Sequence, residues 1–262
     1  MVGILLTRGM LIGFVAGLLC FGFLKIVGEP PVDRAIAYEA AADEAKDKAE
    51  AHDAMAKGMA MPKEDSEPEL VSRSVQAGIG LFTGVAIYST AFGGLFALVF
   101  AFAHRRMGDF DARTTSVLLA ISGIVAVYLV PVLKYPANPP AVGAPDTIGM
   151  RTGLYFAMIA ISLAAMIAAW MLRNRLVPRY GGWNAALIAA AAYLIVVIAV
   201  AFALPDVNEV PDDFPAVVLW QFRIASAGAQ LIMWATIGLA FGALTERAAT
   251  NARGLRLKAA RF

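Results

Sequence analysis

The chain has 262 residues, of which 60% are hydrophobic and 16% are charged. Soluble domains average roughly 45–50% apolar and about 25% charged residues, so the composition excludes an ordinary soluble protein and indicates an integral membrane protein. The net charge of +2 says little by itself, because the two signs are segregated along the chain, and nothing in it indicates a nucleic-acid partner. A single cysteine, Cys20, excludes an internal disulfide.

Six stretches are long and apolar enough to cross a bilayer as helices, which takes about 20 residues. They are expected at about residues 4–27, 75–103, 114–133, 152–172, 183–204 and 216–244. Segment 29–74, between the first two, carries twelve acidic and six basic residues. We expect it to form an extracytoplasmic, partly helical insertion, with residues 35–57 as good helix formers. The whole chain, 1–262, then forms a single membrane domain of the all-α class, a polytopic helix bundle.

The basic residues give an orientation for these spans. Eleven lysines and arginines follow the second, fourth and sixth spans, whereas the short segments 134–151 and 205–216 contain only Lys134 and Arg151. Basic loops favour the cytoplasmic side, so the N- and C-termini are both predicted to be cytoplasmic, which requires an even number of spans.

Glycines spaced four residues apart predict close helix packing in three spans. They are Gly9, Gly13 and Gly17 in the first, Gly80 and Gly84 in the second, and Gly238 and Gly242 in the sixth. No Asp, Glu or His lies inside any span, which excludes a bis-imidazole haem protein. Phosphate-binding loops, zinc-binding histidine pairs and nucleophile elbows are also missing from the sequence, so neither an enzyme nor a self-contained ATP-driven pump is expected.

Three polar segments, 28–34, 134–146 and 204–213, fall on the predicted outer side. Each contains proline and carboxylates, and each is followed by one arginine at the start of the next span: Arg73, Arg151 and Arg223. Carboxylate and amide oxygens are ligands for divalent cations. The candidate metal or substrate pathway is therefore Glu29, Asp33, Asn138, Asp146, Asn208 and Glu209. The open alternative is that these groups pair with Lys25, Arg34, Lys134, Arg151 and Arg223, with Lys134, Arg151 and Arg223 as structural or gating charges.

A second candidate lies in the acidic insertion. His52, Met55, Met59 and Met61 could capture a soft or borderline metal ion before it moves inward, although methionine favours Cu(I) over Co(II). A solvated segment that contains methionine by chance is the alternative.

The polar segments carry a family resemblance. Gly-Glu-Pro-Pro-Val-Asp-Arg-Ala-Ile (28–36), Lys-Tyr-Pro-Ala-Asn-Pro-Pro (134–140) with Asp-Thr-Ile-Gly (146–149), and Asn-Glu-Val-Pro (208–211) with Trp-Gln-Phe-Arg (220–223) closely resemble the CbtA family of predicted cobalt transporter subunits. The resemblance implies a multi-pass protein of the bacterial inner membrane, cobalt uptake linked to cobalamin synthesis, and a small single-span partner, CbtB. Descriptions of the family often give five spans, whereas six are counted here and the charges require an even number.

We therefore expect an integral membrane subunit of a cobalt uptake transporter. Cobalt(II) is its expected substrate, and no permanently bound cofactor is expected. The lipid bilayer and the CbtB-type subunit are the expected partners, and a homo-oligomer stays open. Two alternatives also remain: a non-transporting scaffold or sensor, and a carrier of an organic solute such as a corrinoid.

Overall fold

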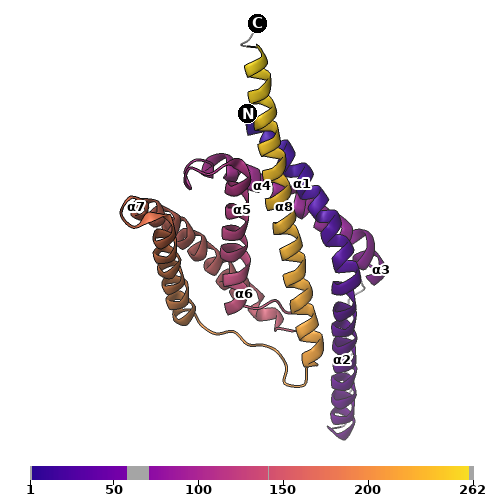
Figure 1. Ribbon diagram of the computed structural model, residues 1–262. Coiled ribbons are helices and arrows are strands. Elements are labelled where there is room, and N and C mark those ends of the chain that lie inside the picture. The colour runs from indigo at the N-terminus through magenta and orange to yellow at the C-terminus, as the bar shows by residue number, and fades with distance from the viewer. Residues whose placement is uncertain (1, 58–70, 141, 260–262) are drawn as a thin grey trace.

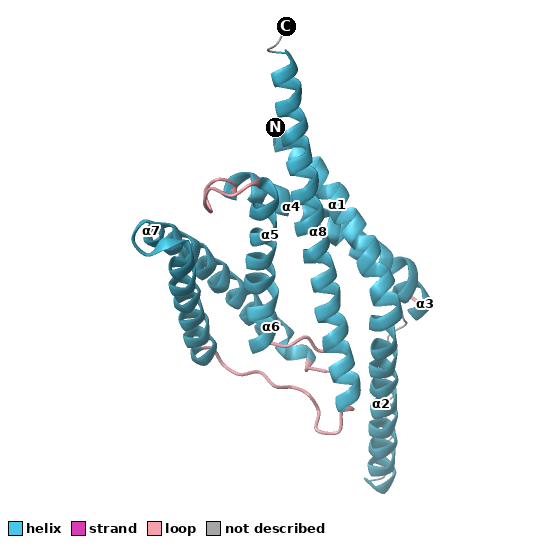
Figure 2. Cartoon of the chain, in the orientation of Figure 1, coloured by secondary structure: helices cyan, strands magenta, loops and turns pink. Residues whose placement is uncertain are grey.

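The structure is a computed structural model that describes residues 2–57, 71–140 and 142–259 (Figure 1). Throughout those ranges the chain is helical apart from short loops, and they contain no strand (Figure 2). The predicted all-α class is confirmed. Met59 and Met61 lie outside the described residues.

The chain begins with one long helical rod rather than a span followed by a bent connector. Helix α1 (Val2–Phe23) passes through a π-helical turn, η1 (Leu24–Gly28), directly into α2 (Glu29–Lys57). Pro30 and Pro31 lack the N–H that a regular helix needs. The π turn precedes them, and there the Glu29 amide donates to the Leu24 carbonyl five residues back. The first polar segment is thus a helical stretch with a local change of pitch.

The remaining elements form three more rods and one bent helix. Their bounds are α3 (Arg73–Val75), η2 (Gln76–Gly80) and α4 (Leu81–Ala103); α5 (Ala112–Gly123), η3 (Ile124–Leu129) and α6 (Val130–Lys134); η4 (Pro145–Thr147) and α7 (Ile148–Ala203); and α8 (Ala216–Ala259). In each of these four groups the elements follow one another directly, with no loop between them.

Five helices in the described ranges are long and apolar enough to cross a membrane: Val2–Ala56, Arg73–Ala103, Ala112–Lys134, Pro145–Ala203 and Ala216–Asn251. Six spans were predicted and five such helices are found, because α7 contains the two predicted spans 152–172 and 183–204. Gly181 interrupts α7 with a φ of 73°, and the helix folds back there (Figure 1). The Ser162 and Tyr193 hydroxyls, one in each limb, lie 2.8 Å apart. Helix α7 is therefore a helical hairpin with two packed limbs.

Helices α1 and α4 meet in backbone contact. A Cβ added at Gly13 would come within 2.2 Å of the Ser89 carbonyl oxygen, and one at Gly93 within 2.2 Å of the Gly9 carbonyl oxygen. At Gly17 the nearest α4 atom, the Ala86 Cα, would lie at 3.2 Å. The predicted packing of the first span through its glycines is confirmed, and this interface leaves no space for an ion.

Helix α8 packs through its glycines on α5. A Cβ at Gly238 would meet the Ala120 Cβ at 2.5 Å, and one at Gly242 would meet the Ser116 Cβ at 2.9 Å, which confirms the prediction for the sixth span. Gly84 does not follow the pattern, since a Cβ there would meet nothing within 4 Å in the described chain. In the second span it is Gly93, not Gly84, that makes the close contact.

The bundle has two chemically different ends (Figure 1). The start of α1, the turn between α4 and α5, the bend of α7 and the last turns of α8 lie at one end, which we call the basic end because the arginine-rich segments are there. Helix α2 and the loops 135–144 and 204–215 lie at the other end, the loop end. The segregation of charge along the sequence is thus a segregation in space.

Candidate outer cation site

The three polar segments meet at the loop end around a small apolar cluster. Ala35 of α2, Val142 of the loop before α7 and Phe214 of the loop before α8 are all buried together. The Tyr38 ring packs edge-on against Phe214 with ring centres 5.0 Å apart, and its hydroxyl donates to Asp213 at 2.7 Å. Three segments that lie 72 to 179 residues apart in sequence are therefore held in one place.

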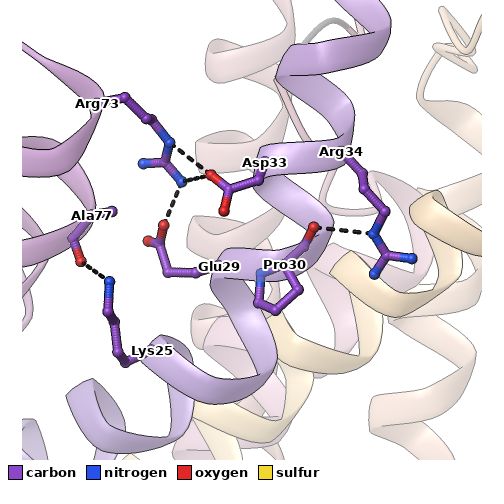
Figure 3. Close-up of polar contacts among 7 residues, drawn as sticks. All are labelled: Lys25, Glu29, Pro30, Asp33, Arg34, Arg73 and Ala77. Atoms are coloured by element: carbon purple, nitrogen blue, oxygen red, sulfur yellow. Dashed lines mark hydrogen bonds and ion pairs between the residues drawn. The ribbon is translucent and has the colours of Figure 1, made fainter.

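Glu29 and Asp33 lie one turn apart on α2 and share one cation (Figure 3). The Arg73 guanidinium binds the Glu29 carboxylate and contacts Asp33 with an N–O distance of 2.8 Å. Lys25 donates to the Ala77 carbonyl at 3.0 Å beside them. These contacts attach the long first helix to the start of the second, so both carboxylates have a structural role in this conformation.

The second and third segments are tied by two further cations. Arg223, near the start of α8, donates to the Asn138 side-chain oxygen at 3.0 Å and to the Ala137 carbonyl at 3.2 Å. Lys134, at the end of α6, pairs with Asp206. The amide of Asn138 is therefore oriented by Arg223, with its oxygen used as an acceptor.

Glu209 has the most elaborate surroundings of the candidate carboxylates. One of its oxygens lies 3.3 Å from Arg151 Nε and accepts the Ala144 amide at 2.8 Å. The pKa of Glu209 is lowered below its ordinary value, mainly by hydrogen bonding with the Thr147 side chain. Burial, the second-largest effect, opposes this, and the Ala144 amide and the Arg151 charge lower the pKa further. Glu209 is thus ionised at neutral pH.

A cavity of about 280 Å³ lies where these contacts converge, and its wall is half polar. Asn138, Arg151 and Glu209 line it together with Tyr135, Pro136, Val142, Thr152, Tyr155 and Val207. The Arg151 Nε is buried and forms no hydrogen bond within the described structure, so its contact with Glu209 is purely ionic.

The other predicted residues lie around this cavity or away from it. Asp146, in the short helix η4, and Asn208, in the loop before α8, are exposed and are not part of its wall. His52 and Met55 are exposed on the far part of α2, one helical turn apart. Within the described ranges, no group of three or more His, Cys, Asp or Glu side chains is arranged to hold a metal ion.

Each of the three arginines that follow the polar segments contacts a carboxylate or amide side chain of one of those segments. Arg73 binds Glu29 and Asp33, Arg151 pairs with Glu209, and Arg223 binds Asn138. The sequence shows their recurrence but not their partners, because Arg151 and Arg223 each reach across to a segment other than the one that precedes them. Two further lining residues, Thr152 and Tyr155, were not predicted. Tyr155 follows Arg151 by four residues and so shares its side of α7, whereas Thr152 is its immediate neighbour in the chain.

Fold and charge distribution together define a polytopic helical membrane protein with its polar loops gathered at one end. The chain belongs to the CbtA family, since the model of that family, described as a probable cobalt transporter subunit, matches residues 2–246. The resemblance seen in the polar segments is confirmed, and the chain is assigned to cobalt transport as a membrane subunit. No curated protein and no solved structure matches it.

Proposed function

We propose that this protein is the subunit through which cobalt(II) crosses the bacterial inner membrane during uptake, and that the cavity lined by Asn138, Arg151 and Glu209 receives the ion from outside. The observation that carries the proposal is the convergence of these three side chains, each from a different part of the chain, on one half-polar cavity at the loop end. That end is poor in basic loop residues, which is typical of the extracytoplasmic side.

Six crossings with both termini in the cytoplasm fit the lengths of the helices. A straight helix of 56 residues would measure about 84 Å, against a hydrocarbon core of about 30 Å. The bend at Gly181 divides α7 into limbs of which the second, residues 182–203, spans about 33 Å. The positions of the basic end and the loop end support the same count.

Glu209 is proposed to exchange its partner when the ion arrives. The lowered pKa keeps the carboxylate charged, and Arg151 neutralises it while the cavity holds water. A divalent ion that loses part of its hydration shell gains the Glu209 carboxylate and the Asn138 oxygen, both of which are hard oxygen ligands. Arg151 is then released and acts as a gating charge. Asp146 and Asn208, exposed nearby, attract the ion toward the cavity.

The cavity suits a hydrated ion better than an organic solute. Its volume of about 280 Å³ lies below the range of roughly 300–1,000 Å³ in which proteins hold drug-sized ligands. Met158, one turn beyond Tyr155 on α7, is only 1% exposed, and we propose that the packing around it closes the cavity toward the membrane interior in this conformation. Release to the cytoplasm requires a second conformation, and it does not run between α1 and α4, where the backbones touch.

The inward-negative membrane potential can supply the driving force. This potential is worth about 2.3 kcal/mol per elementary charge per 100 mV. A divalent ion that crosses the whole membrane therefore gains about 4.6 kcal/mol for every 100 mV. The family description as a subunit implies further chains. We propose that the small single-span CbtB-type protein is one of them, and that the imported cobalt serves cobalamin synthesis.

Uptake of radioactive cobalt by cells tests the role of the cavity. Asn138→Ala and Glu209→Ala should each reduce uptake at limiting cobalt at unchanged protein level. Asp212→Asn is the matched control, because Asp212 is an exposed carboxylate of the same loop outside the cavity wall. Wild-type uptake in both cavity variants would remove these residues from the pathway.

A further inference from the structure

A second cavity, independent of the loop end, lies between α5 and the two limbs of α7. We call it the α7 groove. Its volume is about 310 Å³, and its wall is almost entirely apolar. Met166, Ala169, Trp170 and Arg173 share one face of the first limb, and the exposed Ala186 and Ala190 face them from the second limb. The small alanine side chains leave the groove open at the surface.

The polar groups inside the groove are already satisfied. The Trp170 indole donates to the Ser122 hydroxyl at 3.0 Å, and the Tyr193 hydroxyl pairs with Ser162 at 2.8 Å. An occupant of the deep part therefore meets hydrocarbon surface only. The groove lies between the two apolar limbs of α7, a helix long and apolar enough to cross a membrane, so in a bilayer its open side would face lipid tails.

Arg173 is the one cation in the wall of the groove. Its Nη1 donates to the Met107 carbonyl at 3.3 Å and to the Asn174 side-chain oxygen at 3.1 Å, and the guanidinium lies over the Phe110 and Trp170 rings at 5.2 and 5.8 Å. Nε and Nη2 form no hydrogen bond in the described structure, and no carboxylate there forms an ion pair with Arg173. A positioned guanidinium with two spare donors matches an anion such as phosphate.

The distances along the helix fit one kind of molecule. From Met166 to Arg173 the helix rises about 10 Å, within the roughly 15 Å of one leaflet of a bilayer core. Arg173 lies toward the basic end, where Arg175 and Arg179 are also exposed. We propose that the α7 groove binds an anionic phospholipid of the leaflet at the basic end, with an acyl chain along the alanines and the phosphate on Arg173. The lipid would hold the two limbs of α7 and the α4–α5 turn together.

Native mass spectrometry of the full-length protein, with added phosphatidylglycerol or phosphatidylcholine of identical acyl chains, tests this. Phosphatidylglycerol should bind about tenfold more tightly, and Arg173→Gln should abolish the preference. Arg179→Gln, an exposed arginine outside the groove wall, is the matched control and should keep it. Ala190→Phe fills the groove without touching the bonds of Arg173 and should weaken the binding of both lipids.

Three results would overturn the proposal. They are equal binding of the two lipids by the wild type, equal behaviour of Arg173→Gln and Arg179→Gln, and unchanged lipid binding by Ala190→Phe. Glycerol phosphate provides the last comparison. If it competes as well as the intact lipid does, the site is an anion site without an acyl chain, and the assignment of the groove is wrong.

Discussion

Replacing Gly13 by alanine tests the backbone contact between α1 and α4. The new Cβ would lie 2.2 Å from the Ser89 carbonyl oxygen and 3.1 Å from the Gly93 Cα, whereas ordinary contact begins at 3.4 Å. The shortfall at Ser89 is 1.2 Å, and it is a backbone atom that must yield. A radial gap of about 0.5–1 Å already forfeits a quarter to a half of the dispersion attraction between facing atoms.

We therefore expect Gly13→Ala to lower the free energy of unfolding by about 1–3 kcal/mol, the usual cost of overpacking. Gly84→Ala is the matched control, because its Cβ would meet nothing within 4 Å and alanine favours helix by up to about 1 kcal/mol. Denaturation of both variants in the same detergent, followed by tryptophan fluorescence, gives the comparison. If the two variants prove equally stable, α1 and α4 are not in the contact described.

Three further predictions concern other parts of the molecule. Ser162→Ala should destabilise the α7 hairpin by about 1–3 kcal/mol because it leaves the buried Tyr193 hydroxyl without a partner, and adding Tyr193→Phe should restore most of the loss in a double-mutant cycle. The pKa of Glu209 lies below its ordinary value of 4.5, so the carboxylate stays charged above that pH and is protonated only as the pH falls through the lower, folded-state value. Cobalt binding to the purified protein should therefore stay constant as the pH falls from neutral and be lost only below 4.5, and a decline centred near neutral pH would contradict the assignment. His52→Ala combined with Met55→Ala should reduce uptake only at limiting cobalt if the exposed end of α2 captures the ion, and unchanged uptake there would eliminate capture by these two residues.

Patterns of apolar residues, charge and small residues predicted much of the fold. They located the long helices, gathered the arginine-rich segments at one end, and identified Gly9, Gly13 and Gly17 as a packing face. Each of these features follows from periodicity or composition within one segment. Because these features depend on residues that are close together in the sequence, they can be predicted from a single sequence.

Departures from the expected fold arise where backbone details decide the outcome. Segment 29–74 was predicted to be a partly helical insertion, but the π turn of η1 lets the helix of α1 continue without a loop into α2. At Gly181 a positive φ breaks the helical geometry and reverses α7, so the two predicted spans form the two limbs of one element. Neither outcome can be obtained from residue types alone.

Only part of the cavity lining had been named from the sequence, and the pairings within it had not. Asn138 and Glu209 were identified as candidate ligands because their side chains carry oxygen atoms, and they do line one cavity. That Arg151 would bind Glu209 while Arg223 binds Asn138 depends on how distant loops cross over the bundle. Tyr155 lines the cavity because it lies one helical turn after Arg151. This spacing points to a site only when the position of the cavity is already known.

Metal-resolved flux into proteoliposomes tests the central claim most directly. Wild-type protein and Glu209→Gln are each reconstituted together with the CbtB-type subunit, with an inside-negative potential and external cobalt(II). The account predicts potential-driven cobalt accumulation by the wild type, at least about tenfold slower accumulation by Glu209→Gln, as expected when a charged ligand is lost, and no accumulation of a corrinoid. Equal cobalt flux in the two proteins, or no potential-driven cobalt flux in either, would contradict it.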